Sequence, residues 1–187
     1  MLILLPRLTT KDTCLIAVLT ALCVGSSYAL IGLPNIKFMD IVVFTTGFAF
    51  GTFAGMATGS LAWIVYGALN PLGFSFLIWL STIAGEAVFG MVGGILGKLE
   101  RRDMGNANGL GFSLEMGLWG LVLTLTYDLI TNAVFAIVFK VSIYEAIVMG
   151  WLVPPWFSLL HEASNLLLFS VAVHPLIGAI RKIRGNQ

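Results

Sequence analysis

The carboxylate of Asp128 lies near the middle of a long apolar run, from Phe112 to Phe139. Thr124 precedes it by four residues and Asn132 follows it by four, so at helical spacing the three side chains share one face. A carboxylate placed in hydrocarbon costs several kcal/mol unless it faces a partner, water or a ligand. The rest of the chain must therefore fold so that this face is shielded from lipid.

The composition of the whole chain is that of a membrane protein. Of its 187 residues 58% are hydrophobic and 10% are charged, and the mean hydropathy is +0.97, whereas soluble domains carry about 25% charged residues. At about 20 residues per helical span there is room for about six spans and no soluble domain. We therefore expect an all-α integral membrane protein with one transmembrane domain, residues 1–187. The net charge of +1 gives no basis for a nucleic-acid partner.

Six apolar segments are expected to cross the membrane as a compact bundle. Their approximate ranges are 13–32, 39–51, 53–69, 75–96, 114–139 and 156–180. The second and third come from one run that would be about 46 Å long as a single helix, too long for the bilayer, so we expect a break near Gly51 and Thr52. Residues 140–155 are expected to form a mixed loop that can lie partly in the membrane interface.

The basic residues then predict the orientation of the bundle. With six spans, eight of them fall on the side of the two termini, and Lys37 and Lys140 fall on the other side. The eight are Arg7, Lys11, Lys98, Arg101, Arg102, Arg181, Lys182 and Arg184. Because positive charge concentrates on the cytoplasmic side, we expect a multi-pass protein of the plasma membrane with both termini in the cytoplasm.

Polar side chains of three expected helices converge at similar depth in the outer half of this bundle. We predict a substrate-binding site made of Trp79, Thr82, Glu86, Asp128, Asn132, His161, Glu162 and Asn165. Acids, amides and aromatic rings together suit a small ring compound. Two other interpretations stay open: a single acid can hold neighbouring helices together, and a Trp near a span end can belong to the interfacial belt.

Motifs for catalysis or metal binding are not found in the sequence. The segment from His161 to Asn165 has Asn where a zinc HExxH motif needs its second His. The chain has no GxSxG nucleophile elbow and no P-loop motif. We therefore expect neither an enzyme, nor a metal site, nor a cofactor.

Small residues form two further patterns. Ala17, Ala21 and Gly25 share one face of the first span, where another helix can approach closely. This face either docks a separate protein or packs inside this one. Glycines recur at 47, 51, 55 and 59, and we interpret them as close packing around a tight turn.

The glycine run 47–59, the Ala17-xxx-Ala21 face, the Asn70-Pro-Leu-Gly73 turn and the six short helices resemble the substrate-binding S components of energy-coupling-factor (ECF) vitamin importers. The resemblance implies a pocket near the outer face, covered by the loop after the first helix, here 32–37. It also implies docking of Ala17 and Ala21 on a transmembrane T component, with two cytoplasmic ATP-binding subunits supplying energy.

We therefore expect an S component that binds a vitamin or vitamin precursor from the outside, within membrane lipid. The acidic balance of the predicted site favours a cationic or neutral heterocycle over biotin or pantothenate, which carry carboxylates. The alternative is a structural protein of the cell-shape machinery, in which the polar residues only hold the fold together. An intramembrane hydrolase would need a catalytic pair, which we do not find.

Overall fold

The computed structural model describes residues 9–70, 73–100 and 109–185, and every regular element in these ranges is a helix. The helices are α1 (Thr10–Ala29), α2 (Met39–Phe50), α3 (Thr52–Ala68), α4 (Phe76–Glu100), α5 (Leu110–Phe139), α6 (Ile143–Leu152) and α7 (Phe157–Gly185). Within these ranges four helices, α1, α4, α5 and α7, are long and apolar enough to cross a membrane. The predicted class, an all-α membrane protein, agrees with this architecture.

The helices α2 and α3 are shorter than a full span. At 1.5 Å per residue they are about 18 Å and about 25 Å long, against about 30 Å of hydrocarbon. They form a hairpin, and the expected break between them is confirmed at Gly51, whose φ of +100° lies in the region that favours glycine. Six spans and cytoplasmic termini remain predictions.

Glycines bring α2, α3 and α4 into close contact. A Cβ atom on Gly47 or Gly55 would overlap the backbone of Gly90, and a Cβ on Gly94 would overlap that of Thr52. The predicted role of these glycines in close packing is confirmed. Their partner is the backbone of α4, which packs against both arms of the hairpin.

The segment 140–155 differs from the loop that we expected, because residues 143–152 form helix α6. A capping box begins this helix: the Glu145 N–H donates to Ser142 Oγ (3.1 Å), and the Ser142 N–H donates to Glu145 Oε2 (2.8 Å). The hydrogen bonds from Ser142 also hold the pKa of Glu145 below its usual value. The Ser-x-x-Glu pattern is visible in the sequence and could have predicted the start of α6.

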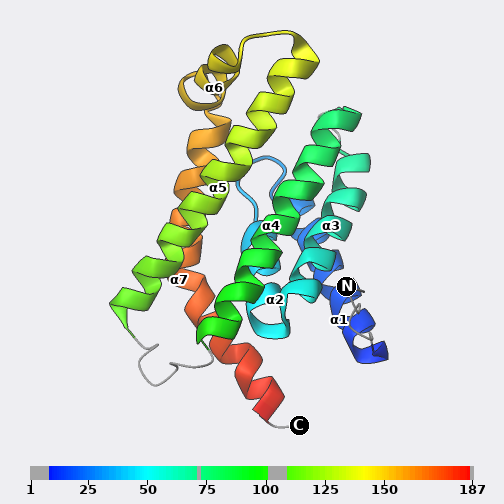
Figure 1. Cartoon of the computed structure of the whole chain (residues 1–187), viewed down its shortest axis with the longest axis vertical. Helices are drawn as coiled ribbons and strands as arrows, with labels where there is room; N and C mark the ends of the chain where they lie inside the picture. Colours follow the sequence, from blue (N-terminus) through cyan, green and yellow to red (C-terminus); the bar gives the residue numbers. More distant parts are fainter. Residues whose placement is uncertain (1–8, 71–72, 101–108, 186–187) are drawn as a thin grey trace, which may run out of the picture.

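Figure 1 shows the helices in two groups that meet along the bundle. Helix α5 packs along α7, while α4 packs against the α2–α3 hairpin and α1 lies on that hairpin. Contacts of α2 with α7 and of α4 with α5 join the groups. The Gly51 turn, the start of α1 and the end of α7 lie at one end, and α6 lies at the other (Figure 1). Of the predicted cytoplasmic cations, Arg7, Arg101 and Arg102 lie outside the described residues, as do positions 71 and 72 of the predicted turn.

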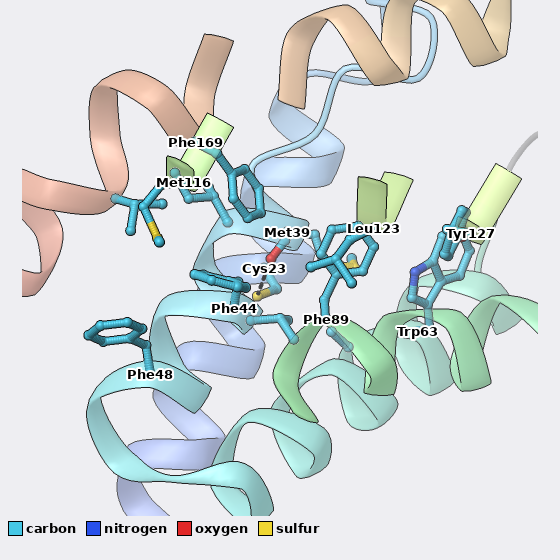
Figure 2. Packing of buried hydrophobic residues seen from close by; sticks show 14 of the residues in the cluster. Cys23, Met39, Phe44, Phe48, Trp63, Phe89, Met116, Leu123, Tyr127 and Phe169 are labelled. Carbon is cyan, nitrogen blue, oxygen red and sulfur yellow. Dashed lines mark hydrogen bonds between the residues drawn. The ribbon is translucent and has the colours of Figure 1, made fainter. Parts of the chain in front are cut away.

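The hydrophobic core lies where the two groups of helices meet. Figure 2 shows aromatic side chains from several helices gathered there. Phe169 of α7 packs on Phe44 of α2 and Phe89 of α4, with ring centroids 5.1 and 6.2 Å apart. Tyr127 of α5 continues the contact from Phe89 to Trp63 of α3, at 6.3 and 6.5 Å. These rings form an apolar platform beside the polar residues of α5 and α7.

Candidate functional site

Five buried side chains from α2, α5 and α7 form a hydrogen-bonded group that we call the inner polar cluster. Its members are Asp40, Thr124, Asp128, His161 and Asn165, each at most 4% exposed. His161 lies between the two carboxylates, with Nε2 2.7 Å from Asp40 Oδ2 and Nδ1 3.0 Å from Asp128 Oδ1. Asn165 Nδ2 lies 2.6 Å from Asp40 Oδ2 and 2.8 Å from Thr124 Oγ1. The cluster therefore joins α2, α5 and α7 where the two groups of helices pack against each other.

The position of His161 between two carboxyl groups determines how many protons the inner polar cluster needs. Each ring nitrogen faces a carboxylate oxygen, and a neutral imidazole carries only one N–H. Both hydrogen bonds form only when a second proton is present, on the ring or on one carboxyl group.

Glu86 of α4 lies next to the inner polar cluster and is fully buried. Trp63 Nε1 donates to Glu86 Oε2 at 3.2 Å, and Trp79 Nε1 donates to the Trp63 carbonyl oxygen at 3.0 Å. Within the described part of the chain Glu86 Oε1 has no hydrogen-bond partner. The two indoles thus tie α3 to α4, and Trp79 serves the packing of these helices.

A cavity of about 380 Å³ opens beside this layer, and we call it the outer cavity. It is surrounded by Trp63 of α3, by helices α4, α5 and α6, by the start of α7 and by the loop 30–38. Its aromatic walls are Trp63, Tyr127, Phe135 and Phe157, and its neutral polar groups include Asn35, Thr82, Thr131, Asn132 and Ser158. Asn132 Nδ2 lies 3.3 Å from Ser158 Oγ, which connects α5 to α7 on the cavity wall.

A second cavity of about 310 Å³, the loop cavity, is lined mostly by residues of the loop 30–38. Both cavities share Asn35, Lys37, Trp63 and Phe157 in their walls. Asn35 Nδ2 donates to the Phe157 carbonyl oxygen at 3.1 Å and so fastens the loop to the start of α7.

Lys37 lines both cavities. Its Nζ atom lies 4.7 Å from the centroid of the Trp63 ring and 5.8 Å from that of Tyr66, so it makes cation–π contacts with both rings. Burial lowers the pKa of Lys37, and the carboxyl groups of Asp40, Glu86 and Asp128 oppose that shift. The loop after α1 thus brings a positive charge to the wall of the outer cavity.

The predicted site residues fall into two groups in the structure. Thr82, Asp128 and Asn132 line the outer cavity. Trp79, Glu86, His161, Glu162 and Asn165 do not line it; they are bound among the helices behind it. Glu162 is 7% exposed and interacts with the side chain of Trp151.

The predicted site did not include Lys37, Trp63 and Tyr127 of the cavity wall, nor Asp40 of the inner polar cluster. A signal existed for Asp40, which is a carboxylate at the second position of an apolar helix. A signal also existed for Trp63, a large aromatic residue inside a span rather than at its end. Lys37 gave no signal, because the path of its loop is not encoded in a periodic pattern.

The small residues of α1 lie on the outer surface of the bundle. Ala17, Ala21 and Gly25 are exposed, together with their neighbours Val18 and Leu22. A Cβ atom on Gly25 would meet no atom within 4 Å among the described residues. This face of α1 is therefore not used for packing within the described part of the chain.

No protein-family model, curated protein or solved structure matches this chain.

Proposed function

We propose that this chain is a membrane-embedded binding protein that captures a small ring-bearing molecule in the outer cavity. The observation that carries the proposal is the cavity itself, about 380 Å³ in volume and lined by aromatic rings with a few polar groups. Binding sites for small molecules are concave, mostly apolar, about 300–1,000 Å³ in volume and oriented by few polar groups. A protein that used its polar residues only for folding would have no need of such a space.

The way the cavity is covered supports capture and release. The loop 30–38 forms one wall, and α6 with the segment 153–155 forms another. Both lie at the end of the bundle opposite the Gly51 turn (Figure 1). A molecule can be enclosed here when these short segments move, while the long helices keep their positions.

In its finer form the proposal is an S component of an ECF-type importer in the plasma membrane, with both termini cytoplasmic. The bound molecule, of vitamin type, would be delivered through a transmembrane T component and two ATP-binding subunits. The exposed face of Ala17, Ala21 and Gly25 supports this, because small residues allow a partner helix to approach closely. The chain would bind and hand over its substrate without changing it chemically.

A thermal-shift screen of the purified full chain against a vitamin library tests the capture step. A compound that binds only the native state raises the melting temperature. Replacing Asn132, which lies on the cavity wall, by Leu should weaken the binding of such a compound at least tenfold, about 1.4 kcal/mol. Glu145→Gln on α6 is the control, because Glu145 is exposed and outside the cavity lining. If no compound raises the melting temperature, the structural alternative is favoured.

The partner step has a separate test. Ala17→Trp places a large ring on the exposed face of α1 and should abolish uptake into cells while ligand affinity stays unchanged. Val171→Trp is the matched control on an exposed position of α7 and should leave uptake intact. Loss of ligand binding in Ala17→Trp would contradict the proposed docking role.

A further inference from the structure

The acidic and basic side chains around the outer cavity differ in the partners that they have within the protein. Asp40 and Asp128 hydrogen bond to His161 within the inner polar cluster, and Glu86 accepts from the Trp63 indole. Asp128 Oδ2 is buried and has no hydrogen-bond partner among the described residues. Glu86 and one oxygen of Asp128 are thus bound within the protein, although Asp128 also borders the cavity. The number of acids in the predicted site therefore does not by itself determine the charge of the ligand.

The ammonium group of Lys37, unlike these carboxyl groups, lacks hydrogen-bond partners in the part of the protein that the structure describes. It has three N–H donors, and within the described residues it forms no ion pair or hydrogen bond. The Trp63 and Tyr66 rings contact it, but a ring face does not replace a hydrogen-bond acceptor. Burial lowers the pKa of Lys37, and the nearby carboxyl groups of Asp40, Glu86 and Asp128 offset this effect only in part. An anionic group beside Lys37 would supply the missing acceptors and favour the charged form.

We infer that the captured molecule carries a carboxylate that pairs with Lys37. This inference rests on the proposed function, since it concerns the ligand of the same cavity. A carboxylate fits better than a phosphate, because Lys37 is the only cation among the described residues of the cavity wall and a phosphate dianion calls for more donors.

The position of Lys37 also orients the molecule. The carboxylate lies at the loop 30–38, where the outer cavity and the loop cavity meet. The ring then packs against Trp63 and Tyr127, and its far edge reaches Asn132 and Ser158. Because Asn132 and Ser158 are neutral, the second polar end of the molecule carries hydrogen-bonding groups without a charge.

Matched pairs of compounds that differ only in the acidic group test the inference. The probes are nicotinate with nicotinamide, biotin with biotinamide, and pantothenate with panthenol, each titrated into the purified full chain. We expect the acid to bind at least tenfold more tightly than its neutral analogue in at least one pair, about 1.4 kcal/mol.

Variants of Lys37 connect that preference to the proposed contact. Lys37→Gln should weaken the binding of the acid at least tenfold and that of the neutral analogue less than about twofold, while Lys37→Arg keeps the preference. Lys140→Gln is the control, since Lys140 is the other cation predicted on this side and is exposed outside the cavity. The melting temperature of each variant without ligand shows that it folds.

The outcomes separate this inference from the proposed function. If the neutral or a cationic compound binds as tightly as the acid, or if Lys37→Gln leaves the affinity for the acid unchanged, the carboxylate is excluded and capture stands. If the six probes fail and the vitamin screen finds a ligand without a carboxylate, the result is the same. If no compound in either set binds, capture itself is excluded and this inference falls with it.

Discussion

The inner polar cluster and the wall of the outer cavity are neighbours in one bundle, but their polar groups are paired differently. In the cluster, Asp40, His161 and Asn165 bind one another across α2 and α7 and are almost completely buried. On the cavity wall, Lys37 has no hydrogen-bonding partner among the described residues, and the amide of Asn132 makes one long contact, 3.3 Å to Ser158.

The difference shows that a polar residue inside an apolar helix has two distinct uses. Where its partners come from other helices, it joins those helices. Where its partners are incomplete and a cavity adjoins it, it is available to a ligand. Asp128 belongs to both regions, because Oδ1 forms a hydrogen bond with His161 Nδ1 and the side chain also borders the cavity.

Removing His161 should produce the largest effect if the cluster is what joins the two groups of helices. His161→Ala leaves Asp40 and Asp128 buried without their shared hydrogen-bond partner, and breaking a buried charge pair costs about 3–5 kcal/mol. We expect a corresponding fall in the free energy of unfolding, measured by denaturant or thermal unfolding in detergent. His174→Ala on the same helix is the control, because His174 is exposed, and it should cost much less. Similar losses for the two variants would contradict the assigned role of the cluster.

Trp63 contacts both Glu86, which lies beside the inner polar cluster, and Lys37 on the cavity wall. Trp63→Phe keeps a ring beneath Lys37 but removes the N–H donor of Glu86, whose other oxygen already lacks a partner among the described residues. An unpaired buried acceptor costs about 1–3 kcal/mol, so we expect that loss of unfolding free energy with the carboxylate preference of Lys37 retained. The measurement is unfolding together with titration of the acid probes.

A matched tryptophan and a double variant sharpen this prediction. Trp79→Phe removes a donor to a backbone carbonyl that already lies within a helix, so it should cost less than Trp63→Phe. Adding Glu86→Gln to Trp63→Phe should restore part of the loss, because an unpaired amide is less costly to bury than a carboxylate. If the two losses simply add, the indole and the carboxyl group are not coupled.

The sequence predicted those features that follow from a local pattern or from a length limit. The break at Gly51 was predictable because a single helix over 39–69 would exceed the bilayer. The shared face of Thr124 and Asp128 was predictable from helical spacing, and both belong to the inner polar cluster. Helix α6 was not predicted, although the capping pattern of Ser142 and Glu145 is visible in the sequence.

The pairing of particular residues could not be predicted in the same way. Asp40 and His161 are 121 residues apart, and no periodicity connects them. Their contact depends on how α2 packs against α7, which follows from the glycine contacts and the aromatic core together. For the same reason the sequence could not distinguish Glu86, which is bound to Trp63, from a residue open to the cavity.

The smallest effect is expected at Asn35, where the cavity wall is fastened by one neutral hydrogen bond to the Phe157 carbonyl oxygen. Asn35 has a φ of 53°, so Asn35→Gly removes the bond without backbone strain. The loss of about 1 kcal/mol should leave global unfolding nearly unchanged but accelerate amide hydrogen exchange in the loop 30–38 about fivefold. Gly32→Ala in the same loop is the control, because its added Cβ meets no described atom within 4 Å. Unchanged exchange in Asn35→Gly would mean that the loop is held as firmly as the inner polar cluster, and that the cavity is closed by more than this one bond.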